Sequence, residues 1–336
     1  MRGERGFVLA STLSILLLLS TIALAVAFMG RLELKAASRR TEARQAYLAA
    51  RSGLTFMEQK ISELDSTYFA LDLLSGEDTW ESSQLPPLPF AFTVKLTDEA
   101  GKLDLNQATG EMLQALGFTQ DEAERIIARR EEHPYATVWE LGEVLALLQD
   151  DWGRIEELAA FLTTISRDLN LNPRGQAKLE LGEFTAQELV QASRGVISQS
   201  VAAKLLPQGE QITQLEELAR ILSKEELAEV VDWVAAGRSS KININTAPEE
   251  VLAAIPGFSE ELVASILQRR EEAPLQQLSD LVLLEEFSLA SWQQCARWVT
   301  VTSTLFCLQA EGSYREAKSS LVAIWDGERY LSWQEE

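Results

Sequence analysis

The sequence is poor in the residues that build catalytic and metal sites. Its 336 residues include one histidine, His133, and two cysteines, Cys295 and Cys307. A single histidine excludes multi-histidine metal centres and argues against a Ser-His-Asp triad. The sequence has no P-loop, no glycine-rich dinucleotide loop and no Cys-x-x-Cys motif. We therefore expect no catalytic residues and no required cofactor, so the chain is not predicted to be an enzyme.

Two cysteines are also too few for a disulfide framework. Cys295 is placed near the end of the last predicted helix, and Cys307 in the strand that follows it. One bridge in an oxidising compartment and two separately buried thiols both remain open, because the distance between the two Cα atoms cannot be read from a sequence.

Basic residues are scarce as well. The chain has 30 Lys and Arg against 51 Asp and Glu, a formal net charge of -21. Such a surface repels polyanions at long range and favours solubility or basic partners. A hydrophobic content of 46% is ordinary for a folded protein, and the length allows two or three domains.

Charge is absent from one long stretch near the N-terminus, in MRGERGFVLASTLSILLLLSTIALAVAFMGR. Residues 7–28 carry no charged side chain, and as a helix they would span about 33 Å, close to the hydrocarbon thickness of a bilayer. A cleaved secretory signal peptide and a plain membrane anchor are alternatives. The apolar run is longer than a signal peptide needs, no small-x-small site closes it, and the helical pattern continues to about Leu64.

The short charged leader followed by Gly6-Phe7 resembles a type IV prepilin signal. That resemblance implies cleavage after Gly6 and N-methylation of Phe7 by a membrane peptidase. Most members then carry a Glu five residues into the mature chain, where this sequence has Ser11. A membrane-embedded Glu is costly unless it is paired, and a subunit with nothing stacked above it has no neighbouring amine to pair with. The superfamily member that lacks this Glu is typically the type II secretion minor pseudopilin K.

The charges that flank the apolar run and the resemblance of the leader predict opposite orientations of the chain in the membrane. The leader offers Arg2 and Arg5, whereas more basic residues follow the run. A count of flanking positive charges alone would place the C-terminal part inside the cell; the leader resemblance implies that it lies in the periplasm. The basic residues after the run are Arg31, Lys35, Arg39, Arg40 and Arg44.

The remaining patterns change from strand to helix and back to strand. Ala91–Leu96 and Lys102–Leu105 predict a hairpin around an Asp-Glu-Ala-Gly turn, and the last part of the chain is again β-like. We expect an α+β fold: a pilin-like long N-terminal helix, an α/β head and an inserted all-α domain of helix-hairpin-helix (SAM-like) repeats. The expected segments are a leader (1–6), the helix (7–64, with 7–28 transmembrane), the head (65–105 and 299–336) and the insert (106–298).

The insert contains an internal repeat. KININTAPEEVLAAIPGFSEELVASILQRR, from Lys241, matches the segment that begins at Lys102, 139 residues earlier. A weaker third copy is predicted from Leu169, with extra residues before its first helix. The predicted hinges are Gly117, Gly195 and Gly257, because each position demands a backbone angle that other residues resist.

Local capping is predicted within each hairpin. Thr119, Ser198 and Ser259 suit the N-caps of the second helices, and Thr246 is expected to cap a first helix. Asn106 and Asn245 are expected to bond nearby backbone at the entry to the first helix.

Hairpins of this kind usually bind nucleic acid through a Gly-hydrophobic-Gly hinge that meets a phosphate. Here Thr or Ser replaces the second Gly, and each Arg-Arg pair is followed at once by Glu-Glu. No basic stripe is present. The hairpins are better interpreted as a protein-contact scaffold. A membrane-anchored DNA receptor remains an alternative, since competence-type receptors carry a very similar hairpin.

Taken over its full length, the chain resembles type II secretion minor pseudopilin K proteins (general secretion pathway protein K). The leader, the D-E-x-G-K-x-x-x-N segment from Asp98 to Asn106, the K-I-N-I-N-T-A motif and the terminal strands carry the resemblance. It implies a subunit at the tip of the periplasmic pseudopilus that helps to initiate assembly and supports protein export. It also implies a single-pass protein of the bacterial inner membrane with its bulk in the periplasm. A minor pilin of a type IV pilus is a further alternative.

The same resemblance implies the partners: the I- and J-type minor pseudopilins, the major pseudopilin, the prepilin peptidase, exoproteins and the secretin. Periplasmic pseudopilins often bind calcium, and Asp98, Glu99 and Asp104, or Asp150 and Asp151, offer carboxylate oxygens. None of these residues has a loop spacing that identifies a calcium site.

Overall fold

The computed structural model describes residues 2–64, 66–74, 78–84, 88–145, 152–205, 212–237 and 240–335. Residues 2–10 are described as helical backbone only, so the predicted cleavage and methylation positions, Gly6 and Phe7, have no side-chain description. Asp150 and Asp151 lie outside the described residues.

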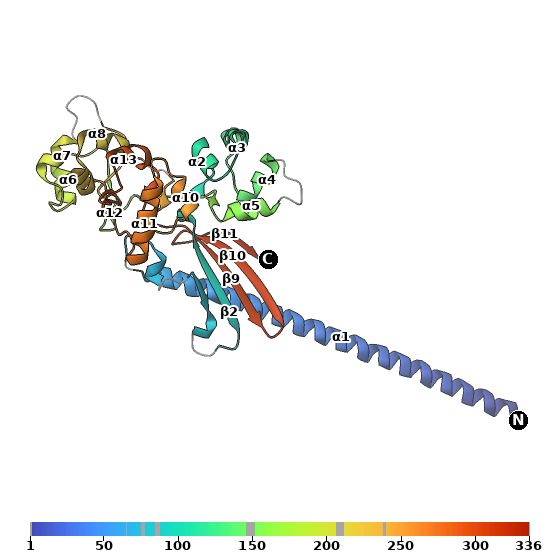
Figure 1. Cartoon of the computed structure of the whole chain (residues 1–336). Helices are drawn as coiled ribbons and strands as arrows, with labels where there is room; N and C mark the ends of the chain where they lie inside the picture. The colour runs from blue at the N-terminus through green and yellow to red at the C-terminus, as the bar shows by residue number, and fades with distance from the viewer. Residues whose placement is uncertain are drawn as a thin grey trace.

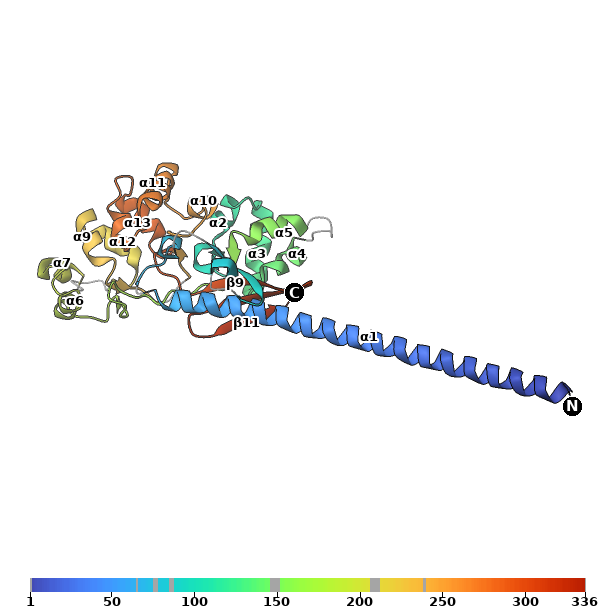
Figure 2. The ribbon, with the colours of Figure 1, turned by 90° about the horizontal axis from the view of Figure 1, so that it is seen from below.

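The N-terminal helix is one continuous rod. Helix α1 (Arg2–Ser62) has no internal proline, and Figures 1 and 2 show its first half projecting away from the rest of the molecule. By length and composition it is able to cross a membrane: an 18-residue window has mean hydropathy 2.4 and no buried side chain. Its second half is buried against the sheet, with Ala50, Leu54 and Met57 fully enclosed.

The helix packs on a five-stranded antiparallel sheet of order β1-β2-β9-β10-β11. Alternate side chains along β2 and β9, among them Val94, Leu96 and Leu308, face the helix and form one core. The strands are β1 (Thr79–Glu81), β2 (Ala91–Asp98), β9 (Phe306–Tyr314), β10 (Ala317–Trp325) and β11 (Tyr330–Glu335).

Gly312 marks the closest approach of sheet and helix. A Cβ atom at this position would lie 2.2 Å from both Ala46 O and Ala50 N of α1. Both are backbone atoms of a rigid helix, so β9 runs against the helix backbone at this point because residue 312 has no side chain.

The predicted hairpin between Ala91–Leu96 and Lys102–Leu105 is wrong. Strand β2 pairs with β1 and β9, and the Asp-Glu-Ala-Gly segment forms a 3-10 turn, η3 (Glu99–Gly101), that carries the chain out of the sheet. The next strand, β3 (Leu103–Asp104), pairs in parallel with β4 (Leu162–Thr163). A local turn pattern gave no information about this distant partner.

Between β2 and β9 the chain forms a helical block, residues 103–300, built from three units of the same order. Each unit begins and ends with a two-residue strand, and the two strands pair in parallel. The pairs are β3–β4 in repeat 1 (103–163), β5 (Leu179–Glu180) with β6 (Val234–Ala235) in repeat 2 (179–235), and β7 (Ile242–Asn243) with β8 (Val299–Thr300) in repeat 3 (242–300).

Within each repeat the strand leads into two successive helix pairs. The helices are α2 (Gly110–Ala115), α3 (Gln120–Glu132), α4 (Leu141–Val144) and α5 (Trp152–Ala159) in repeat 1; α6 (Ala186–Ala192), α7 (Gln199–Lys204), α8 (Leu218–Ile221) and α9 (Lys224–Val230) in repeat 2; and α10 (Glu249–Ala253), α11 (Glu260–Glu272), α12 (Leu278–Val282) and α13 (Leu289–Cys295) in repeat 3. The insert is therefore mainly helical but not all-α.

Repeat 2 begins later than the sequence suggested. Its first strand is the KLEL segment at Lys178, which matches the KLDL segment at Lys102 without a gap, 76 residues later. The Leu169 segment taken as the start of this copy is a connecting loop, with Asn170 at a φ of 51°.

The helical block has its own core. Its buried residues run from Leu103 to Val301, slightly beyond the expected insert (106–298), and are distinct from the core between α1 and the sheet. Figures 1 and 2 show repeats 2 and 3 beyond the end of the sheet that lies away from the free end of α1, and repeat 1 beside the sheet.

Candidate functional site

The hairpin hinges have the predicted conformation. Gly117, Gly195 and Gly257 have φ values of 90°, 84° and 84°, in the left-handed region. The N-cap prediction is confirmed as well: Thr119, Ser198 and Ser259 accept from the backbone N–H groups of Glu122, Val201 and Leu262, respectively.

One of the three hinges is covered. A Cβ on Gly257 would lie 2.9 Å from Gln294 Cβ and from Ser291 O, so α13 packs directly on the hinge of repeat 3. A Cβ on Gly117 or Gly195 would meet no atom within 4 Å, although Arg154 Nη2 donates to Gly117 O at 3.5 Å.

The arginine pairs act inside the protein. Arg130 Nη1 donates to Leu105 O at 2.9 Å and to Ala108 O at 2.6 Å. Arg270 makes the equivalent bonds in repeat 3, to Ile244 O at 3.1 Å and Ala247 O at 2.7 Å. Burial lowers the pKa of both guanidinium groups. Each second arginine thus ties the end of its hairpin to the strand-to-helix entry, and is not available to a phosphate.

The first arginine of each pair also bonds backbone. Arg129 donates to His133 O, and Arg269 Nη1 donates to Ala273 O at 3.1 Å. These bonds satisfy carbonyl groups just beyond the last helical turn. The motif that suggested nucleic-acid binding is explained by the folding of the hairpin itself.

The two asparagines at the helix entries bond distant backbone, so the expectation of local bonds is wrong. Asn106 Oδ1 accepts from Tyr135 N at 2.7 Å, and its Nδ2 donates to Tyr135 O at 3.0 Å. Asn245 exchanges the same two bonds with Leu275, both at 2.9 Å. Each side-chain amide therefore imitates a strand partner and holds the start of the second helix pair.

The head and the helical block meet at Asp98. Its Oδ2 accepts from Thr246 Oγ1 at 2.5 Å, from Ser303 Oγ at 2.5 Å and from Asn243 Nδ2 at 3.0 Å. Its Oδ1 accepts from Ala100 N at 2.9 Å. Burial nevertheless raises the pKa of Asp98 to about 6, against the lowering effect of these four donors.

Thr246 consequently does not cap a helix. The residue at the N-cap of α10 is Pro248, which has no side-chain cap. The predicted cap is wrong because the N-cap position falls two residues later than Thr246, whose hydroxyl instead donates to the buried Asp98 carboxylate.

A second buried tie lies beside the first. Lys241 Nζ is 2.7 Å from Asp168 Oδ2 and donates to Asn170 Oδ1 at 2.6 Å. Burial acts to raise the pKa of Asp168, but the Lys241 ammonium outweighs it, so the pKa of this carboxyl is below its usual value. Burial lowers the pKa of the neighbouring Lys178 ammonium to about 8. The loop after repeat 1 is thereby fixed to the start of repeat 3.

The calcium candidates do not form a metal site. Asp98 is occupied by the four donors above, Glu99 Oε1 is 2.7 Å from Lys102 Nζ, and Asp104 Oδ2 accepts from Ser240 Oγ at 2.6 Å. Within the described residues, no group of three His, Cys, Asp or Glu side chains is placed to hold an ion. These three carboxylates do not fit a calcium site.

The cysteines are unbridged in this structure. Cys295 is buried in the core of the helical block, whereas Cys307 lies on β9 of the sheet. Burial raises the pKa of both thiols, that of Cys307 to about 11. Of the two alternatives that the sequence left open, the structure has separate thiols, because Cys295 lies inside the helical block and Cys307 lies on the sheet.

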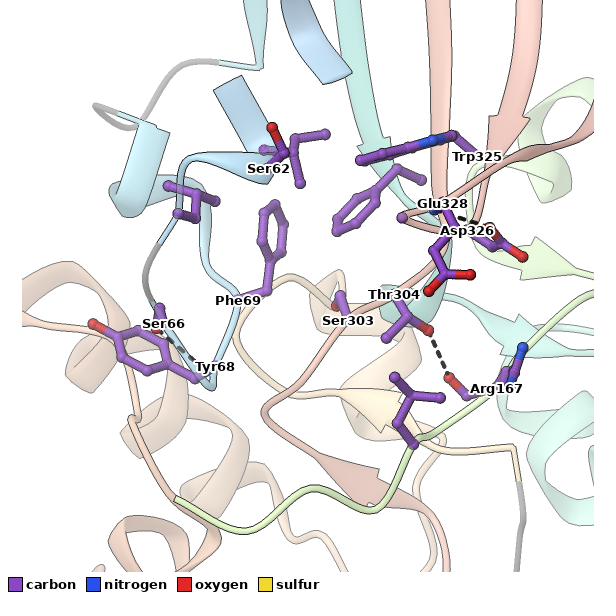
Figure 3. Close-up of a pocket in the computed structure, with 15 residues that line it drawn as sticks. Ser62, Ser66, Tyr68, Phe69, Arg167, Ser303, Thr304, Trp325, Asp326 and Glu328 are labelled. Carbon is purple, nitrogen blue, oxygen red and sulfur yellow. Dashed lines mark hydrogen bonds between the residues drawn. The ribbon is translucent and has the colours of Figure 1, made fainter. Parts of the chain in front are cut away.

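A pocket of about 370 Å³ opens between the end of α1, the linkers to the helical block and the β10–β11 turn (Figure 3). Its floor is aromatic: the Phe306 ring centroid lies 4.8 Å from that of Phe69 and 6.2 Å from that of Trp325. Arg167, Asp326 and Glu328 stand at its rim. Sequence analysis missed this pocket, because its walls come from four segments that are far apart in the chain.

These features together define a class of protein. A long apolar N-terminal helix that packs on an antiparallel sheet, with a helical block inserted before the last strands, is a pilin-like α+β protein with one helix suited to single-pass membrane anchoring. The α+β class with a long N-terminal helix, expected from the sequence, is confirmed.

The comparisons with known proteins are specific for one family. The family model for "Type II secretion system (T2SS), protein K" matches residues 242–297, which is nearly all of repeat 3. Over this part of the chain the match supports the resemblance to the minor pseudopilin K family that was recognised from the sequence. A search of curated proteins found no match.

Among solved structures, the chain is similar to one in the crystal structure of the GspK-GspI-GspJ complex from the enterotoxigenic Escherichia coli type 2 secretion system. The identity is 16%, the match covers 89% of this chain and 99% of that chain, and the TM-score is 0.47.

Proposed function

We propose that this protein is the minor pseudopilin at the tip of a type II secretion pseudopilus, where it helps to initiate assembly and supports protein export across the outer membrane. The observation that carries the proposal is the match of repeat 3 to the protein K family, in a chain that also has an exposed apolar rod. The family is a secretion-system component, and the role we propose is structural rather than catalytic.

The shape of the molecule supports a position at the tip. Repeats 2 and 3 of the helical block lie at the end of the head opposite the free end of α1 (Figure 1). In a fibre built from side-by-side rods, a bulky block on the far end of one head leaves little space for a further subunit beyond it. Ser11 agrees with this position, because a subunit at the end of the fibre has no neighbouring amine for a buried Glu to pair with.

The partners follow from the same proposal. The similar chain from Escherichia coli was crystallised with GspI and GspJ, and we propose the corresponding minor pseudopilins as partners here. The major pseudopilin, the prepilin peptidase, exoproteins and the secretin complete the set. The peptidase is proposed to cut after Gly6 and to methylate Phe7, and the head and helical block are proposed to lie in the periplasm.

The leader gives the first test. Mass spectrometry of the protein from cells with the peptidase should find a mature chain that begins at a methylated Phe7. Gly6→Leu should block the cut, because a bulky side chain replaces the small residue at the site, and should abolish co-purification with the minor pseudopilins.

Gly3→Leu, in the same leader, is the matched control and should leave the cut unchanged. A mature chain that begins at Met1, or downstream of residue 25, would overturn the proposal.

A further inference from the structure

Four basic side chains follow one another along α1 just after its apolar half. We call this set the basic collar: Arg31, Lys35, Arg39 and Arg40. All four are exposed, and in the described part of the chain none of them has an ion pair. Glu42, the acid closest to Arg39 and Arg40 in sequence, is engaged by Arg315 at 3.2 Å. Glu33 is the one acidic residue within the collar, so four cations outweigh a single carboxylate there, in a chain of net charge -21.

Neighbouring Arg44 does not belong to the collar. Its guanidinium carbon lies 5.4 Å from the centroid of the Tyr47 ring, so this cation already has a partner on the helix. The collar ends where the helix begins to pack on the head, since Ala46 is the first fully buried residue of α1.

The collar lies where a headgroup layer would be. If residues 7–28 fill the hydrocarbon core, Arg31 is about 5 Å and Lys35 about 10 Å beyond Phe28 along the axis. The headgroup layer is about 5–8 Å thick, and long basic side chains reach back toward it. Arg39 and Arg40 remain within about two Debye lengths of the phosphates.

The four charges span half of the helix circumference. At about 100° per residue, Arg31, Lys35 and Arg39 cover a sector of about 80°, and Arg40 lies about 180° from Arg31. A single neighbouring acidic helix would contact the stripe of the first three and miss Arg40, whereas a lipid headgroup layer surrounds the helix and meets all four.

From these observations we propose that the basic collar binds the phosphate groups of anionic phospholipids in the leaflet from which α1 emerges. The inference rests on the proposed membrane-spanning role of α1. It explains why positive charge is tolerated on the side of the span where the positive-inside rule disfavours it. Guanidinium groups suit phosphates because they donate two parallel hydrogen bonds.

The test uses the full chain reconstituted in phosphatidylcholine vesicles that contain spin-labelled phosphatidylglycerol or spin-labelled phosphatidylcholine. Electron paramagnetic resonance then measures the fraction of each lipid that is motionally restricted by the protein. The wild type should restrict phosphatidylglycerol several-fold more strongly than phosphatidylcholine, and 0.5 M salt should weaken the preference.

A collar variant with all four residues changed to Gln should restrict the two lipids equally. The matched control changes four cations of the head-packed half of α1 and the sheet to Gln, and should keep the wild-type preference. The control residues are Arg51, Lys60, Lys95 and Lys318. Circular dichroism checks that both variants remain as helical as the wild type.

Two outcomes would overturn the inference. The wild type could show no lipid preference, or the collar variant could retain it. A collar variant that retains the preference and also loses its partner proteins would show an acidic protein as the occupant. If α1 did not enter the bilayer, neither lipid would be restricted, and the proposed membrane role would fail instead.

Discussion

At the scale of single residues, one buried carboxylate holds the two halves of the molecule together. Asp98 ends β2, and its partners Asn243, Thr246 and Ser303 are 145, 148 and 205 residues away in the sequence. A carboxylate that accepts four hydrogen bonds stays buried without an ion pair, but burial still disfavours its charged form. The head–block junction is therefore sensitive to pH.

The sign of this effect is set by the raised pKa. Between about pH 4 and pH 6 the folded state keeps the proton on Asp98 while the unfolded state has lost it, so stability from this group falls as pH rises, by about 2–3 kcal/mol in all. In Asp98→Asn the group no longer titrates. The difference in unfolding free energy between wild type and Asp98→Asn should therefore decrease from pH 4 to pH 6 and stay constant above.

Urea unfolding followed by tryptophan fluorescence measures this difference. Glu81→Gln, at an exposed carboxylate on β1, is the control and should show no such trend. A difference that increases with pH would mean that the four donors outweigh burial and lower the pKa.

The role of a residue could be predicted from the sequence when its bonding partners are close to it in the chain. The hinge glycines and the caps at Thr119, Ser198 and Ser259 act within a few residues, so the sequence was sufficient for them. The roles of Thr246 and Asn245 depend on distant groups, and both predictions were wrong. The sequence shows the charge of Arg130 and Arg270 but not their carbonyl partners, which lie more than 20 residues earlier in the chain.

At the scale of secondary structure, α1 and β9 depend on one another. Leu54 and Met57 of the helix are fully buried against the sheet, and Gly312 lets β9 approach the helix backbone. The sequence predicted that the helix continues to about Leu64, close to its observed end at Ser62. The two-residue strands of the helical block were not predictable, because such segments are too short to show a period.

Gly312→Val should destabilise the head strongly. The new Cβ would lie 2.2 Å from two backbone atoms of α1, and neither strand nor helix can move away without losing hydrogen bonds. We expect a loss of several kcal/mol, the range of severe overpacking. Thermal unfolding by circular dichroism measures the change.

Ser313→Val, at the next position of β9, provides the comparison and should cost less than about 1 kcal/mol. Equal melting temperatures for the two variants would show that the helix is not held against β9 at residue 312.

The alignment of the repeats also belongs to this scale. The sequence contains a gap-free match between KLDL and KLEL. The Asn-rich LNLNP segment resembles the K-I-N-I-N-T-A motif more closely, and for that reason it predicts the wrong start for repeat 2. Strand pairing settles the alignment, because β5 occupies in repeat 2 the place of β3 and β7 in the others.

At the scale of the whole molecule, the sequence was sufficient for the overall plan: a rod, a sheet and an inserted helical block. Composition and periodicity carry that information because each part buries a separate core. The pocket at Phe69, Phe306 and Trp325 was not predictable, since it exists only where the parts meet.

The charge of the whole molecule makes DNA binding unfavourable. In an electrophoretic mobility assay at 50 mM salt, the full chain in detergent should leave a labelled duplex unshifted, because the repulsion of a -21 surface is not offset by a basic stripe. A shift that disappears at 200 mM salt, and in the variant Arg194→Gln beside the open hinge at Gly195, would contradict this expectation.

The unbroken course of α1 has a mechanical consequence. A helix of 61 residues without a kink transmits torque as well as thrust. A screw motion applied to its base would turn the head through nearly the same angle, and the helical block, set off from the axis, would sweep an arc around it. Each step of fibre growth would then swing the block across whatever lies above.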